Sequence, residues 1–215
     1  MTPLQKIAMG LVIVILPANF PAHPHPAWRF YDALPDPIGW VLVVAGVWAL
    51  GRSSGLELAS VRWLAALALL VSVPLWFPQL NHLLVPRYNP DITISGQWAI
   101  SLPQTLFSLF LARRIRAAGA AAEPRDRYVV SRFGVLSWGL VALVVLPIVA
   151  YGGGASRLEG PTLVLIGLVN VAFVFYLFMV HRREFLGGPG PREWTLRERL
   201  PEDARRPPPD GERPS

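Results

Sequence analysis

The sequence of 215 residues contains no cysteine. Disulfides, thiolate nucleophiles and cysteine-ligated metal sites are therefore excluded. Charged residues are also scarce, at 16% of the chain against 53% hydrophobic residues, and the mean hydropathy is +0.40. A chain of this length carries more apolar surface than one soluble core can hide, so the composition indicates a membrane protein.

Charge is missing from six long stretches, which contain no Asp, Glu, Lys or Arg: residues 7–28, 37–51, 63–86, 92–112, 133–156 and 160–180. A helix that crosses the hydrocarbon core needs roughly 17 to 25 apolar residues. The sequence therefore predicts an all-α integral membrane bundle of about six transmembrane helices, formed as one domain by residues 1–186. The fourth stretch is the weakest, because Pro103 interrupts it and only residues 102–112 are largely apolar.

The cations are unevenly shared between the two sides of this predicted bundle. With six spans, 17 of the 20 Lys and Arg residues fall on one side, and only Arg29, Arg87 and Arg157 fall on the other. The positive-inside rule then places both termini in the cytoplasm of a bacterial cell membrane. A five-span alternative, which omits residues 92–112 and inverts the first three spans, gives 16 against 4. Charge alone does not choose between these two arrangements.

The two ends of the chain differ in character. The apolar run after Lys6 is short, but no clear small-x-small cleavage site follows Pro17. We expect the segment to be retained as an anchor rather than removed as a signal peptide. From Gly187 the chain is rich in proline, glycine and mixed charge, so residues 187–215 are predicted to form a disordered cytoplasmic tail.

The second charge-free stretch begins with a helix-start pattern, Leu34-Pro35-Asp36-Pro37-Ile38-Gly39-Trp40. Asp36 is suited to cap free amides, and Pro37 suits the first helical position. The segment resembles the Leu-Pro-Asp-x-x-Gly-aromatic segment of small, uncharacterised multi-pass membrane proteins of bacteria. The resemblance covers residues 30–51, about a tenth of the chain. It implies the membrane architecture and carries no activity with it.

Aromatic residues fall near the ends of the predicted spans, as interfacial belts require. Those near predicted outer ends are Trp40, Trp76, Trp98 and Tyr151, and those near inner ends are Trp48, Trp63 and Trp138. This arrangement explains most of the tryptophans without a cofactor.

Ionisable residues are absent from the middle of the confident spans, which disfavours coupled transporters and proton pumps. Ser101, Gln104 and Ser108 share one face of the fourth predicted helix, and Asn170 lies in the last. These side chains suit either a path for a small neutral solute or hydrogen bonds between helices, at about 0.6 kcal/mol each.

Histidines on the predicted outer side suggest a third hypothesis. His23, His25 and His82 lie there together with three aspartates, and such side chains suit zinc. No recognised ligand spacing links them. An outward metal site is therefore an alternative rather than the leading interpretation.

Basic residues on the predicted cytoplasmic side are placed to contact anionic headgroups, at about 1 kcal/mol per residue. They are Arg113, Arg114 and Arg116, in the cytoplasmic loop expected after the fourth span, and Arg182 and Arg183, after the last span. No aromatic interleaving indicates nucleic-acid binding. The phosphate-binding loop, dinucleotide and zinc-protease motifs are also missing, and the Gly51–Gly55 match to a nucleophile elbow joins two membrane helices, so no cofactor and no enzymatic activity is predicted.

Three functional hypotheses are compatible with these features of the sequence. The leading one is a non-enzymatic structural or modulatory component that contacts the lipid bilayer and a membrane-protein partner. The alternatives are a channel or facilitator for a small neutral solute and an outward metal-binding protein.

Overall fold

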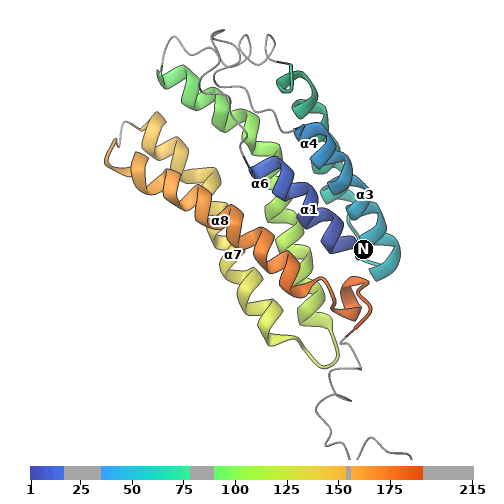
Figure 1. Cartoon of the computed structure of the whole chain (residues 1–215). Helices are drawn as coiled ribbons and strands as arrows, with labels where there is room; N and C mark the ends of the chain where they lie inside the picture. The colour runs from blue at the N-terminus through green and yellow to red at the C-terminus, as the bar shows by residue number, and fades with distance from the viewer. Residues whose placement is uncertain (17–34, 78–89, 154–155, 191–215) are drawn as a thin grey trace, which may run out of the picture.

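The computed structural model describes residues 1–16, 35–77, 90–153 and 156–190 (Figure 1). This part of the chain is helical and contains no strand, so the all-α prediction is confirmed. It has one α-helix for each charge-free stretch: α1 (Pro3–Ile15), α3 (Asp36–Ser54), α4 (Ala59–Leu75), α6 (Pro90–Ala121), α7 (Arg127–Pro147) and α8 (Glu159–Val180). A π-helical segment, η1 (Ile148–Gly152), and two short 3-10 turns, η2 (Ser156–Leu158) and η3 (Glu184–Leu186), complete it.

Three of these helices are long and apolar enough to cross a membrane: α3, α8, and α7 continued to Ala150. α1 and α4 are apolar but shorter. At 1.5 Å per residue, the 13 residues of α1 span about 20 Å, or roughly two-thirds of a bilayer core. The described chain is therefore compatible with a membrane protein, with helices of unequal reach.

The helices pack in chain order, and the order of contacts closes into a ring. α1 packs on α3, α3 on α4, α4 on α6, α6 on α7 and α7 on α8, while α8 also contacts α1. Successive helices run in opposite directions, so the α3–α4 and α6–α7 turns and the N-terminus gather at one end, toward the lower right of Figure 1. The carboxyl end of α8 reaches the same end of the bundle.

Glycines let α1 and α3 approach until their backbones touch. A Cβ atom added to Gly10 would lie 2.4 Å from the carbonyl oxygen of Gly39, and one added to Gly39 would lie 2.7 Å from that of Gly10. Farther along, a Cβ at Gly46 would lie 2.6 Å from Cγ1 of Ile7. Close packing through small residues is the usual way membrane helices associate, because lipid removes much of the hydrophobic drive between them.

α6 is longer than the sequence predicted. It continues through Pro103 without interruption, and its 32 residues span about 48 Å. The expected basic loop at Arg113–Arg116 is therefore wrong: these residues are helical. Alanine and arginine favour helix, and Phe107, Leu111 and Ile115 form a buried stripe at four-residue spacing that packs this helix into the bundle.

The second helix begins one residue earlier than its proline suggested. α3 starts at Asp36, and Pro35 rather than Asp36 occupies the capping position. The Asp36 carboxylate still lies in the first turn, where it meets the positive end of the helix dipole.

One tryptophan of the predicted interfacial belts belongs to the core instead. The Trp40 side chain is only 3% exposed, and its ring meets Phe107 of α6 edge to face, with centroids 5.5 Å apart. The belt prediction for Trp40 is therefore wrong, because packing between helices takes up its aromatic surface. Trp63 and Trp138, by contrast, are 77% and 75% exposed.

Candidate functional site: the basic end of the bundle

Eleven of the twelve Lys and Arg residues in the described part of the chain lie at or near one end of the bundle. We call this the basic end; its cations are Lys6, Arg52, Arg62, Arg113, Arg114, Arg116, Arg125, Arg127, Arg132, Arg182 and Arg183. The twelfth, Arg157, lies at the opposite end, in η2. Alternating helix directions produce this clustering, since each cation sits near the start of one helix or the end of the next.

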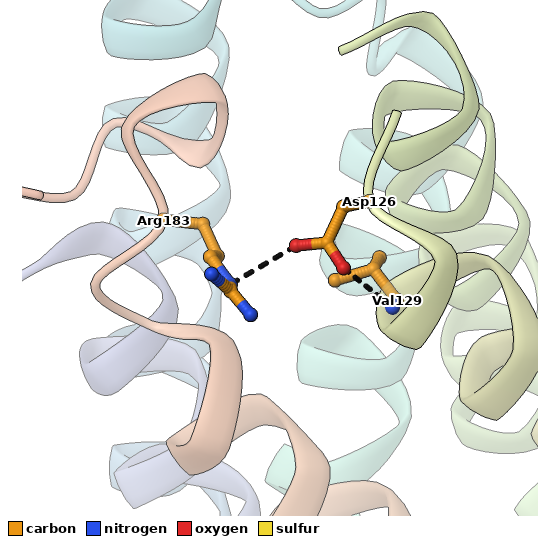
Figure 2. A network of polar contacts seen from close by, with 3 residues as sticks. All are labelled: Asp126, Val129 and Arg183. Carbon is orange, nitrogen blue, oxygen red and sulfur yellow. Dashed lines mark hydrogen bonds and ion pairs between the residues drawn. The ribbon is translucent and has the colours of Figure 1, made fainter. Parts of the chain in front are cut away.

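An ion pair joins the end of α8 to the turn between α6 and α7. Nε of Arg183 lies 3.1 Å from Oδ2 of Asp126, while Oδ1 of Asp126 accepts a hydrogen bond of 3.1 Å from the Val129 amide (Figure 2). Asp126 thereby caps α7 as well. Because the Arg183 side chain is 48% exposed, water screens the pair, and we expect the cap to contribute more stability than the charge.

Substitutions of Asp126 separate these two roles. Asp126→Ala removes both and should destabilise the protein by about 1 kcal/mol. Asp126→Asn keeps a good capping side chain and removes only the ion pair. The loss of stability in this variant should therefore be about half that in Asp126→Ala, or less. The measurement is the unfolding temperature in mild detergent. Equal losses in the two variants would show that the ion pair, rather than the cap, holds this turn.

A pocket of about 620 Å³ lies at the basic end, between the start of α1 and the turn that follows α8. Thr2, Gln5, His181, Arg182 and Gly188 are among its lining residues. Nε of Arg182 donates a hydrogen bond of 3.3 Å to the carbonyl oxygen of Gly190, which folds residues 187–190 back against the bundle. Gly187 and Gly190 have positive φ angles of 70° and 78°, which permit this turn.

Arg62 is a further cation of this end that the sequence interpretation did not single out. Its guanidinium carbon lies 4.5 Å from the centre of the Trp48 ring, and the guanidinium covers Gly51. The Nε atom is buried and has no hydrogen-bond partner within the described residues. Gly51 lies three residues before the end of α3 and Arg62 lies three residues after the start of α4, so the helical hairpin brings them together, with Trp48 one turn before Gly51. This symmetry was the available signal.

The structure of the same turn shows that the pattern at Gly51–Gly55 is not a nucleophile elbow. Ser53 and Ser54 lie in the last turn of α3, and both hydroxyls donate to the carbonyl oxygen of Leu50, at 3.3 and 2.6 Å. Gly55 ends the helix with a φ of 66°. These serines therefore belong to a helix end, not to a turn from strand to helix.

The five predicted lipid-contacting arginines all lie at the basic end, although in different settings. Arg113 and Arg116 are exposed on the last turns of α6, and Arg114 and Arg182 are half-buried. Arg183 forms the ion pair with Asp126. The exposed pair on α6 is thus the most available to an external anion.

The polar residues predicted within the membrane interact locally where their bonds are seen. The Ser101 hydroxyl donates to the Trp98 carbonyl at 2.8 Å, and the Asn170 amide donates to the Ile166 carbonyl at 3.0 Å. Both bonds stay within one helix. Ser108 is buried and Gln104 half-buried, so these four residues serve packing at least as well as a solute path.

The histidines of the metal hypothesis, His23, His25 and His82, lie outside the described residues. Within residues 1–16, 35–77, 90–153 and 156–190, no three His, Asp or Glu side chains are grouped to hold a metal ion. The metal hypothesis therefore gains no cluster of ligands from this part of the chain.

Comparison with protein-family models, with curated proteins and with solved structures finds no match to this chain.

Proposed function

We propose that this protein is a six-span component of the bacterial cell membrane, with its basic end and both termini in the cytoplasm. In this proposal it is not an enzyme. It acts as a structural or modulatory component that binds anionic lipid headgroups, and a membrane-protein partner, through its basic end. The observation that carries the proposal is the gathering of eleven described cations at one end of an apolar bundle.

Contacts between the two halves of the chain support six spans over five. The five-span alternative inverts the first three helices, which would put Ser53 and Gly187 on opposite faces of the membrane. In the structure they are neighbours, since a Cβ at Gly187 would lie 2.0 Å from the Ser53 hydroxyl oxygen. Thr2 and His181 likewise border the same pocket. Both contacts join the first half of the chain to the end of α8 and the turn that follows it.

The energetics of the basic end suit attachment to an anionic surface. Each arginine close to such a surface contributes about 1 kcal/mol, and salt screens the attraction so that it falls off over a Debye length of about 8 Å at physiological ionic strength. Arg113 and Arg116 are exposed on a stiff helix, so they present charge without the ordering cost of a loop. A partner with an acidic cytoplasmic face would use the same charges.

Single cysteines introduced into this cysteine-free chain test the arrangement. Gly160→Cys lies at the start of α8, where a Cβ atom meets nothing within 4 Å, and Ala121→Cys lies exposed at the end of α6. A membrane-impermeant thiol reagent should label Gly160→Cys on intact cells. It should reach Ala121→Cys and Ser53→Cys only after the membrane is opened. The parent chain controls for background labelling.

Each departure from this pattern contradicts a particular part of the proposal. Labelling of Ser53→Cys from outside, with Ala121→Cys protected, would establish an inverted first half. Labelling of Ala121→Cys but not Gly160→Cys would reverse the whole orientation. Equal labelling of all three variants in lysate and their absence from the membrane fraction would remove the membrane assignment.

A further inference from the structure

A groove of about 570 Å³ runs along the outside of the bundle between α7 and α8. Each helix contributes a stripe of residues at three- and four-residue spacing, so the groove follows the helix axes. The residues that matter for its chemistry are Arg132, Trp138, Gly139 and Ala142 of α7 and Leu168 and Tyr176 of α8. We call it the α7–α8 groove.

The groove has a polar mouth and an apolar body. Arg132 and Tyr176 lie at the mouth, toward the basic end, because α7 begins there and α8 ends there. Gly139 provides a floor, where a Cβ atom would meet the Val169 side chain at 3.0 Å. Trp138 and Leu168, which are 75% and 64% exposed, provide apolar walls. An elongated ligand with one charged end fits this order of residues.

The length of the groove matches one leaflet of a bilayer. Arg132 and Ala142 are ten residues apart on α7, which is about 15 Å along the helix. A bilayer core is about 30 Å thick, so a groove that begins at the basic interface ends near the midplane. A transmembrane helix of a partner would need a surface that continues to the other interface, whereas this hollow stops at half that depth.

Charge at the mouth selects an anion. The Arg132 guanidinium carbon lies 5.7 Å from the centre of the Tyr128 ring, and the Tyr128 and Tyr176 rings meet at 6.3 Å. No ion pair neutralises Arg132 among the residues that the structure describes. A guanidinium suits phosphate geometry, and it stacks on aromatic rings more readily than lysine does.

We propose that the α7–α8 groove binds one anionic phospholipid, with an acyl chain on Gly139 and Ala142 and the phosphate at Arg132. The inference rests on the membrane orientation proposed above, since that orientation puts the mouth of the groove at headgroup level. It goes beyond general headgroup contact because it assigns a single site with a defined depth.

The test is native mass spectrometry of the delipidated full-length protein in mild detergent, titrated with phosphatidylglycerol or phosphatidylcholine. The parent protein should retain one phosphatidylglycerol in preference to phosphatidylcholine. Arg132→Gln should weaken phosphatidylglycerol binding about tenfold. The matched control is Arg127→Gln, which removes an exposed arginine one and a half turns away on the same helix and outside the groove. Ala142→Leu narrows the apolar body and should weaken both lipids without changing their ratio.

Several results would overturn the inference. Equal losses in Arg132→Gln and Arg127→Gln would show diffuse attraction to the whole basic end. No retained lipid on a folded parent protein would exclude the site. A dimer that Ala142→Leu dissociates would assign the groove to a second copy of the chain. None of these results depends on the cysteine labelling, so failure of the orientation and failure of the lipid site are recognised separately.

Discussion

Gly10→Ala should destabilise the protein by about 1 to 3 kcal/mol, although alanine is the better helix former. The added methyl group would lie 2.4 Å from the Gly39 carbonyl oxygen and 2.8 Å from Cγ2 of Val43. Because the first of these is backbone, no side-chain rotation relieves the overlap, and α1 must move away from α3. The measurement is the unfolding free energy in detergent or lipid micelles.

Gly167→Ala is the matched control for this substitution. Gly167 also lies within a helix, α8, but a Cβ atom there meets nothing within 4 Å. The control should be neutral or more stable by up to about 1 kcal/mol, from helix propensity alone. Similar effects at Gly10 and Gly167 would contradict the backbone contact between α1 and α3.

Phe107→Ala should lower the free energy of unfolding by about 3 to 5 kcal/mol, which is the largest loss that we expect from truncating one side chain. Phe107 is fully buried in α6 and meets the Trp40 ring of α3 edge to face. Truncation leaves a cavity at the junction of these helices and removes the ring contact. The measurement is thermal unfolding of the purified protein, monitored as the loss of soluble monomer.

Phe110→Ala removes the same side chain from the same helix one turn further on. Phe110 is 36% exposed, so its surroundings can fill the space with lipid or detergent. Phe110→Ala should lower the free energy of unfolding by less than about 1.5 kcal/mol, which is half the smallest loss expected for Phe107→Ala. A larger loss at Phe110 than at Phe107 would mean that the two faces of α6 are assigned the wrong way round.

The positions of the helices could be predicted because lipid excludes charge, so each run without Asp, Glu, Lys or Arg became a helix. Which side of each helix faces inward could not be predicted. Leu140 is buried and Val135 is 70% exposed on α7, while Phe173 is buried and Phe175 is 55% exposed on α8. These residues are equally apolar, because the interior of the bundle and the lipid both favour apolar side chains. The inward and outward faces of each helix therefore do not differ in hydrophobicity, and the sequence does not distinguish them.

The basic end was predictable in composition but not in its contacts. Sequence identified the arginines as a group from their position between spans. It did not distinguish Arg183, which pairs with Asp126, from Arg132, which ends a groove. That distinction depends on how α7 and α8 are rotated against each other. The helical structure of Arg113–Arg116 was not predicted, because the first charged residues were assumed to mark the end of the helix. They mark only the end of its membrane-spanning part.

The contact between α1 and α8 has a consequence for how the chain is made. About 144 residues separate Ile15 from Glu159. At a synthesis rate of about 5 to 20 residues per second, α1 is complete roughly 7 to 30 s before α8 begins to emerge. During that interval α3 is the main partner available to α1, through Gly10 and Gly39. The first helix is therefore complete long before its second neighbour exists, and a chain that lacks α8 leaves one side of α1 uncovered.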